Sequence, residues 1–294
     1  MRSNLLIPLL TSLIGIGCCQ APPPAAQPFH PNPNETMAQV VSGINANNRK
    51  IPTLWASLYY RADIRDRGRT HTVFGEGVLL YRAPMGMRLV GQKEFVGTVF
   101  EIGSTESQYW LQIKPELNTL WIGRYADLAH VDIDRLPIPI PPDLVLSVLG
   151  IESIDTNLTA MPAPTMRYNN EQDVYMFVWN VKAPDRWVAQ KEIWYDRATR
   201  RPKRVLLYDA NGRTVLRADL SMQRAVRLYD VPEKDWPVMP GDYKLFFPDT
   251  GSRMEFTINE ARLTAREGVL PNIHPPDVEG TDVKVIQIGA GAGV

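Results

Sequence analysis

The sequence LLYRAPMGMR, residues 79–88, joins two runs of alternating residues. Pro84 cannot donate a backbone hydrogen bond and therefore marks the end of the first run. Gly86 permits a tight bend, after which the alternation resumes at Met87. The stretch predicts a strand that passes through a short turn into a second strand. Arg82 stands at the corner, where its side chain could point into the concave side of a curved sheet or out to solvent.

The strand ahead of this corner carries apolar residues on both of its faces. One face has Val73, Gly75, Gly77 and Leu79, and the other has Thr72, Phe74, Glu76, Val78 and Leu80. Because neither face is cleanly polar, we expect one packed side and a second side that is also shielded from bulk water.

Similar β-type segments surround this strand. In the first half of the chain, alternating β-branched or aromatic residues occupy 54–64, 72–81, 87–91, 97–102, 108–113 and 119–125. The links between them are too short for parallel crossovers, so these strands pair as an antiparallel meander. The β signal returns at 174–181, 188–195, 203–208 and 214–221, and 243–247 and 254–258 could complete the sheet.

Two helices are expected besides the strands. Asn34 is a candidate N-cap with Glu35 in the first turn, and apolar residues at helical spacing then predict one amphipathic helix of about 14 residues. Prolines 137–142, Asp143 and the closing Gly150 predict a second, short helix that is apolar almost all round. Such a helix must be covered on more than one side or must cap an apolar cavity.

These elements predict a mainly β (α+β) fold. A sheet of about ten or more strands curls or closes, and two helices can cover only part of it. We therefore expect a single large antiparallel sheet curled into an unclosed half-barrel, with an N-terminal amphipathic helix and a short apolar lid helix. The pattern leaves open whether the barrel is hollow or filled.

The N-terminus resembles the signal of a bacterial lipoprotein. Arg2 precedes an apolar run, residues 5–16, that is too short to span a bilayer, and small residues then lead to Cys18. In such proteins the cysteine carries acyl chains such as palmitate, which anchor the protein to a membrane. Cys19 is a second candidate acceptor, and an ordinary signal peptide or a short uncleaved anchor is the alternative interpretation. The localisation expected from this signal is a bacterial membrane facing the periplasm, the outer membrane before the inner one.

The composition of the 294 residues indicates where one segment ends and the next begins, and it argues against some classes of partner. We expect a signal peptide at 1–17, a Pro-rich tether at 18–34, the half-barrel at 35–260 and a C-terminal tail at 261–294. Lys+Arg and Asp+Glu are equal at 32 each, so no basic excess attracts nucleic acid. Both cysteines lie at 18 and 19, so the folded part has no disulfide framework. We expect a monomer.

The order helix, six-strand meander, short apolar helix and second meander resembles the LolA/LolB superfamily of bacterial lipoprotein carriers and receptors. The local motif is Gly75-x-Gly77 followed by Arg82-x-Pro84, with Ala83 inserted where the family has an Arg-Pro pair. The resemblance covers residues 34–258. It implies an unclosed barrel whose cavity holds acyl chains or lipoproteins, in a chain more like the membrane-anchored receptor than the soluble carrier.

The same resemblance implies roles for particular residues. Arg82, beside Pro84, would gate the cavity, although a strand-end arginine is usually solvated or paired. Phe95 and Val96, on a hairpin loop, would contact membrane or else fold back onto the core. The lid residues would be Leu144, Leu146, Val148 and Leu149. Aromatic residues could line the cavity or form ordinary core, in particular Phe74, Trp110, Trp121 and Trp179.

Catalytic chemistry and cofactors have little support in the sequence. The four histidines are scattered, and no metalloprotease, nucleophile-elbow or Walker motif occurs. His130, Asp132 and Asp134 could be metal ligands on one side of a strand, but a loop entering the Pro-rich link is the simpler interpretation. Gly289, Gly291 and Gly293 lack the helix that a phosphate-binding loop needs.

The leading hypothesis is a membrane-anchored periplasmic lipoprotein that binds an apolar or acylated ligand in the half-barrel, without cofactor, metal or catalysis. The alternative is a non-transporting envelope lipoprotein that docks a protein partner or senses the state of the envelope. A hydrolase that uses His130 and Asp132 is a distant third.

Overall fold

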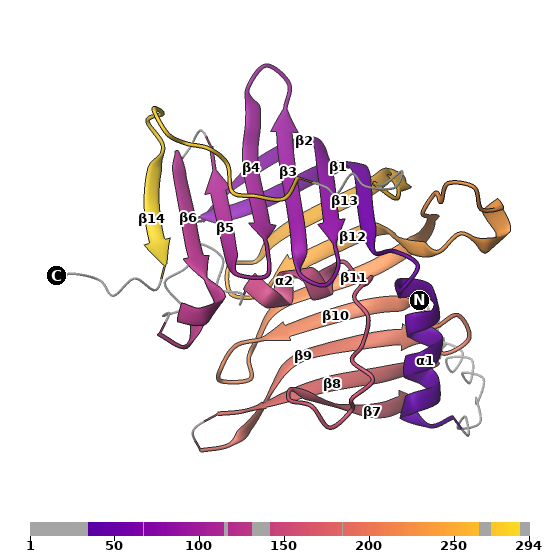
Figure 1. Cartoon of the computed structure of the whole chain (residues 1–294). Helices are drawn as coiled ribbons and strands as arrows, with labels where there is room; N and C mark the ends of the chain where they lie inside the picture. The colour runs from indigo at the N-terminus through magenta and orange to yellow at the C-terminus, as the bar shows by residue number, and fades with distance from the viewer. Residues whose placement is uncertain are drawn as a thin grey trace, which may run out of the picture.

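The chain folds around one large, unclosed β-sheet (Figure 1). The computed structural model describes residues 35–66, 68–114, 117–130, 142–183, 185–264 and 272–288. The first half contains α1 (Met37–Asn48), β1 (Thr53–Asp66), β2 (Arg69–Arg82), β3 (Gly86–Lys93), β4 (Gly97–Ser104), β5 (Gln108–Ile113), β6 (Thr119–Arg124), η1 (Tyr125–His130) and α2 (Pro142–Val148). The second half contains β7 (Ala163–Asn169), β8 (Val174–Lys182), β9 (Trp187–Asp196), β10 (Pro202–Tyr208), β11 (Thr214–Ala225), η3 (Glu233–Asp235), β12 (Val238–Phe247), β13 (Ser252–Arg262) and β14 (Lys284–Ile288).

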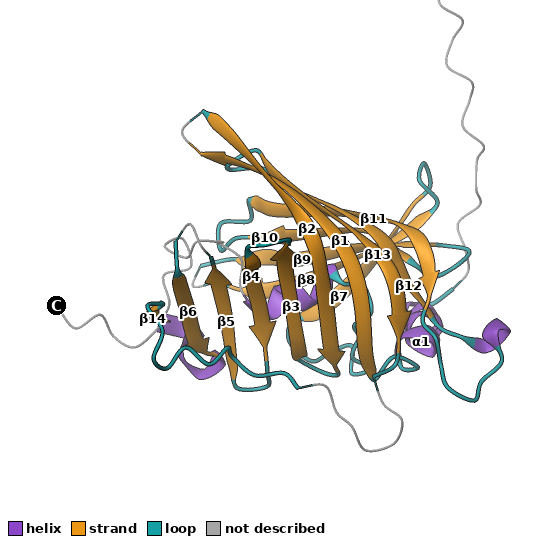
Figure 2. Cartoon of the chain, turned by 90° about the horizontal axis from the view of Figure 1, so that it is seen from above, coloured by secondary structure: helices purple, strands orange, loops and turns teal. Residues whose placement is uncertain are grey.

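Two antiparallel meanders share this sheet. The strand order is β14-β6-β5-β4-β3-β2-β1-β13-β12-β11-β10-β9-β8-β7, so β1 and β13 join the meander β1–β6 to the meander β7–β13. Figure 2 shows how strongly the joined sheet curls. The predicted fold class is therefore confirmed, as is the turn at Pro84, because β2 ends at Arg82 and β3 begins at Gly86.

Two strands were not predicted. β7 pairs with β8 at one edge of the sheet, and β14 pairs in parallel with β6 at the other. The segment expected to be a C-terminal tail, residues 261–294, contains β14. In the same segment, Ile273 packs beside Trp110 and Leu120. A five-residue strand whose partner lies far away in sequence leaves little periodic signal, which explains the omission.

Glycines allow β2 to approach its neighbour β3 closely. A Cβ atom on Gly75 would lie 2.0 Å from the carbonyl oxygen of Gln92, and one on Gly77 would lie 2.7 Å from that of Val90. A side chain at either position would force the two strands apart. The Gly75-x-Gly77 pattern thus has a local structural reason, since it permits tight packing on the inner face of a curled sheet.

Helix α1 begins two residues later than predicted. Thr36, rather than Asn34, is the N-cap, and it forms a capping box in which Gln39 bonds back to the Thr36 amide. Glu35 therefore precedes the helix. Val40, Val41 and Ile44 are buried against the sheet, as their spacing predicted, and Figure 1 shows α1 crossing β7–β10.

Glu35 connects the start of α1 to the second meander. Its carboxylate accepts hydrogen bonds from the Tyr175 hydroxyl and from Arg200, whose Nη2 lies 2.5 Å from Oε1. The bond from Tyr175, together with the Arg200 charge, lowers the pKa of Glu35, while burial and the Glu35 carboxylate raise the pKa of Tyr175 to about 12. A carboxyl group with a depressed pKa stabilises the fold only while it is ionised.

We expect Glu35→Gln to lower the free energy of unfolding at neutral pH by about 1 kcal/mol, the upper range for a partly exposed ion pair. Because the folded-state pKa is below the ordinary value of 4.5, the difference between wild type and variant should persist above that pH and shrink as pH falls below it. Urea unfolding on both sides of this value measures the difference. The exposed Glu171→Gln is the control, and a pH-independent difference would contradict the expected linkage.

Candidate functional site

Helix α2 fills the inner side of the curled sheet. Leu144, Leu146, Val148 and Leu149 are all buried, with exposed fractions between 2% and 6%. They belong to one apolar cluster that includes Leu79 and Tyr81 from β2 and Phe177 and Trp179 from β8. The helix is therefore packed against both meanders, as its all-round apolar sequence predicted, and in this conformation its side chains occupy the concavity.

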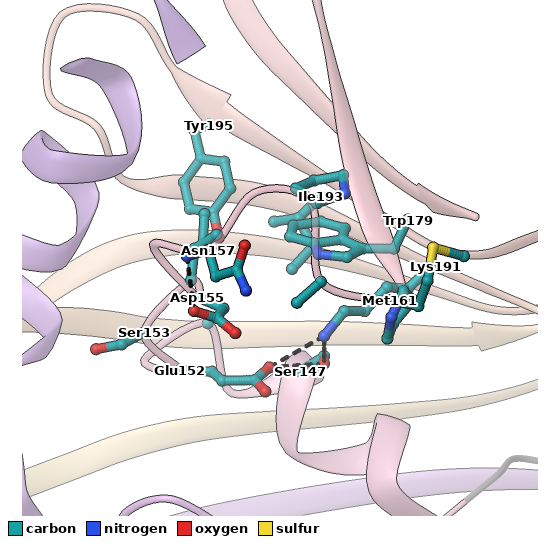
Figure 3. A pocket seen from close by; sticks show the side chains of 15 residues that line it. Ser147, Glu152, Ser153, Asp155, Asn157, Met161, Trp179, Lys191, Ile193 and Tyr195 are labelled. Carbon is teal, nitrogen blue, oxygen red and sulfur yellow. Dashed lines mark hydrogen bonds and ion pairs between the residues drawn. The ribbon is translucent and has the colours of Figure 1, made fainter. Parts of the chain in front are cut away.

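One polar network lies inside this apolar contact. The Lys191 amino group, on β9, donates to Ser147 Oγ of α2 at 2.8 Å and to Glu152 Oε2 at 3.2 Å. The Ser147 hydroxyl donates to the same Glu152 oxygen at 2.9 Å. Lys191 Nζ also lies 4.9 Å from the centre of the Trp179 ring. Figure 3 shows these groups converging between the helix and the sheet.

Asparagines of α1 fix the segment that follows α2. The Asn45 side chain exchanges two hydrogen bonds, each 2.8 Å long, with the backbone of Ile154, and Asn48 Nδ2 donates to the Glu152 carbonyl at 2.8 Å. The Tyr243 hydroxyl donates to the Leu149 carbonyl at 3.1 Å. The backbone at both ends of this turn is thus anchored, so the Glu152 carboxylate is the part that can move. Asn45 is itself buried, with 1% of its surface exposed.

A cavity of about 200 Å³ adjoins the network. It lies between the α2–β7 segment and strands β8 and β9, and its lining includes Ser147, Glu152, Met161, Trp179, Lys191, Ile193 and Tyr195. This volume is below the roughly 300–1,000 Å³ typical of small-molecule sites. A long acyl chain can therefore enter only if α2 moves.

The charge of the Glu152 carboxylate helps to raise the pKa of two tyrosines, one in each meander. Burial, with a further contribution from the Glu152 charge, raises the pKa of Tyr81 on β2 to about 12. The same two causes raise the pKa of Tyr195 on β9. Both phenols are therefore neutral hydrogen-bonding groups at physiological pH. The negative charge of Glu152 consequently lies where the inner faces of the two meanders meet.

Arg82, the predicted gate, lies on the other face of the sheet. Successive strand residues point to opposite sides, and Tyr81 belongs to the inner cluster. On the outer side, the Arg82 Cβ lies beside Gly86, next to Ile273. No hydrogen bond or ion pair joins the Arg82 side chain to the described residues, and Pro84 is exposed. The structure therefore gives Arg82 no contact with α2.

The four candidate cavity aromatics separate into two groups. Trp179 lines the cavity, and Trp121 lies half-buried on the inner side of β6. Trp110 instead packs with Ile273 on the outer face, where its Nε1 donates to Glu101 Oε1 at 2.9 Å. Phe74 is on that outer face and is 63% exposed. The structure thus brings only Trp179 of these four to the cavity.

The hairpin between β3 and β4 presents the predicted apolar pair to solvent. Phe95 is 99% exposed and Val96 is 48% exposed, so neither folds back onto the core. Phe95 also has a φ of 62°, which is uncommon for a bulky residue. This geometry holds an aromatic side chain away from the protein surface.

Other candidates fall outside the described residues. Cys18 and Cys19 do, as do Asp132, Asp134 and the terminal glycines, and the side chain of His130 is not described. Within the described ranges, no three His, Cys, Asp or Glu side chains come together as a possible metal site. The described helices, 12 and 7 residues in α1 and α2, are too short to span a bilayer.

Sequence reasoning missed Lys191, Ser147 and Glu152. A signal was present for one of them, because Lys191 alternates in phase with Ile193 and Tyr195 and so belongs to an inward-facing row. A lysine in such a row needs a buried partner or an exit to solvent. The identity of that partner depends on how α2 is seated on the sheet, which no local pattern specifies.

Fold and site together define a class: an unclosed antiparallel half-barrel whose inner face is filled by a short apolar helix. No protein-family model matches the sequence, and no curated protein matches it significantly. Among solved structures, the chain is similar to a domain from Vibrio parahaemolyticus named for outer membrane lipoprotein sorting, with 15% identity, a TM-score of 0.51, and coverage of 80% of this chain and 94% of that one.

A LolA superfamily protein from Nitrosomonas europaea is also similar, with 12% identity, a TM-score of 0.48, and coverage of 79% and 95%. The likeness to the Vibrio parahaemolyticus domain agrees with the fold expected from the sequence, one large sheet that is not closed. At these identities the likeness concerns the fold alone.

We expect Lys191→Met to raise hydrogen exchange of the α2 amides about tenfold, because the substitution removes the charge-assisted bonds between helix and sheet. Arg82→Leu, the matched loss of a cation on the outer face, should leave α2 exchange unchanged. Mass-spectrometric hydrogen exchange on residues 142–149 makes the comparison. Equal exchange in both variants would show that Lys191 does not hold the helix.

Proposed function

We propose that this protein is a periplasmic lipid-binding lipoprotein of the carrier or receptor type. It binds an apolar or acylated ligand, either a lipid or the acyl chains of a lipoprotein, between the sheet and α2. The supporting observation is that the apolar side chains of α2 cover the inner face of the open barrel. A ligand chain could make the same contacts with the sheet, at about 25 cal/mol for each Å² of apolar surface buried.

The inner face is suited to such an exchange. Leu144 and Leu146 are buried side chains of a helix of only 7 residues, and the buried Leu149 follows it directly. A helix this short has little intrinsic stability without its packing. Beyond the helix, the inner side of β4–β6 carries half-buried apolar side chains, among them Ile102, Leu111 and Trp121. A chain that displaces α2 would find a continuous apolar surface there.

Membrane attachment completes the proposal. Acylation at Cys18 would anchor the chain facing the periplasm, with residues 18–34 as the tether. The fold neighbour named for lipoprotein sorting is compatible with a role in envelope lipid or lipoprotein trafficking.

A ligand can be sought directly in the purified protein. We expect organic extraction followed by mass spectrometry to recover acyl-containing molecules, and a fluorescent fatty acid to bind and be displaced by them. Leu146→Ala should lower the free energy of unfolding by about 2–5 kcal/mol. It should nevertheless strengthen probe binding, because displacing a smaller helix side chain costs less.

Leu120→Ala is the matched control, since Leu120 is equally buried but lies under Ile273 on the outer face. It should destabilise the fold without changing probe binding. A protein free of lipid that also stays closed to the fluorescent fatty acid would exclude the carrier function. That result would favour the alternative, an envelope lipoprotein that docks a protein partner or senses envelope state.

The Phe95–Val96 hairpin is proposed to touch the membrane. In a Cys18→Ser/Cys19→Ser background, which lacks the acyl acceptors, we expect Phe95→Ser to reduce partitioning onto lipid vesicles at least about tenfold, because an exposed phenylalanine contributes roughly 1.5–3 kcal/mol on burial. Vesicle co-sedimentation measures this. Met222→Ser removes another exposed apolar side chain, on β11, and should have no effect. Equal loss in both variants would argue against a specific contact.

A further inference from the structure

The ion pair beneath α2 is unequal in its burial. The Lys191 side chain is 12% exposed, whereas that of Glu152 is 38% exposed. If the pair separates, the carboxylate can turn into water and remain solvated, but the ammonium group cannot follow it. A buried cation whose partner can leave is able to exchange that partner for another anion.

The Glu152 carboxylate occupies a position defined by two donors. Both the Lys191 ammonium group and the Ser147 hydroxyl direct hydrogen bonds to the single oxygen Oε2, at 3.2 and 2.9 Å. Charge-assisted donors that converge in this way recognise an oxygen anion. The Glu152 oxygen therefore marks where the oxygen of an anionic ligand would sit.

The surroundings supply the apolar half of the site. Trp179 and Ile193 form a wall of the cavity on one side of Lys191, and Ser147 on α2 lies on the other side (Figure 3). Lys191 is the one lysine or arginine among the residues that line this cavity. A second carboxylate, that of Asp155, is at the exposed mouth, where its Oδ1 accepts from the Asn157 amide at 2.8 Å.

We propose that Lys191 and Ser147 form the head-group site of the protein, and that the preferred ligand is an amphiphile whose polar end is an anionic oxygen group, either a carboxylate or a phosphate. This oxygen replaces that of Glu152, and the attached chain takes the apolar space beneath α2. The inference rests on the proposed lipid-binding function and specifies its ligand class. A neutral acyl chain, such as that of a lipid-modified protein, offers the two donors only an uncharged carbonyl oxygen and would gain less from them than an anion does.

The test compares two ligands of equal chain length. Dodecanoate and dodecan-1-ol each compete against a fluorescent fatty acid for the full-length protein. Wild type should prefer dodecanoate about tenfold or more, the range for a hydrogen bond to a charged group. Lys191→Met should abolish this preference, while Lys191→Arg, which keeps the charge, should retain most of it.

Two further variants sharpen the comparison. Glu152→Gln removes the competing carboxylate and should strengthen dodecanoate binding severalfold without strengthening dodecan-1-ol binding. Lys203→Met removes an exposed cation, with 49% of the side chain exposed, and should change neither. Repeating the assay with a dodecyl-chain lysophosphatidic acid distinguishes a phosphate head group from a carboxylate, and tighter binding of either over the alcohol supports the site.

The outcomes separate the two proposals. If wild type binds the acid and the alcohol equally, or if Lys191→Met weakens both by the same factor, the head-group site is overturned while lipid binding stands. If no amphiphile binds, the lipid-binding function itself is overturned. Circular dichroism of each variant confirms that the sheet is intact.

Discussion

The pairing of β1 with β13 is the contact on which the rest of the structure depends. It joins residues from opposite ends of the folded chain and converts two separate meanders into one continuous sheet. A sheet of this width curls, and the curl brings the inner sides of the two meanders toward each other. The apolar rows of β2 and β8 can then contact the same short helix, α2. Neither meander alone would enclose that space.

Among the side chains that the structure describes in and after α2, the polar contacts lie at the carboxyl end of the helix. The amino-terminal part of the helix is held by leucine packing, whereas Ser147 and the turn after it bond to β9, to α1 and to Tyr243. Apolar packing is non-directional and can be taken over by another apolar group. The polar contacts are directional and fix where the helix ends. A ligand could thus replace the apolar packing of α2, while the polar contacts keep the end of the helix in position.

Much of the fold was predictable because strands with one packed face leave a period of two in the sequence. The phase of that alternation already grouped Arg82 with Leu80 and Phe74, opposite Leu79. What could not be predicted was which face would be concave, since this depends on the curl of the whole sheet, and the gating role assigned to Arg82 followed from the resemblance instead. β14 escaped prediction because it has only five residues and its partner is far away in sequence, and β7 because Pro164 stands inside it and weakens its strand signal. The Lys191 network escaped because its three members meet only through tertiary packing.

The position of Lys191 is difficult to explain by stability alone. Burying an ammonium group is costly, and an ion pair with a partly exposed carboxylate offsets only part of that cost. An apolar side chain of similar length would pack against Trp179 without the desolvation penalty. The pair therefore holds the end of α2 locally more than it adds to the free energy of global unfolding, and it places a positive charge and a hydroxyl donor at the inner end of the space that α2 covers. In a barrel that closes on its own helix, such a charge gives the enclosed space a polar end and an apolar end. An amphiphile likewise has one polar end and one apolar end. Lys191 on β9 would therefore set the orientation in which such a molecule enters.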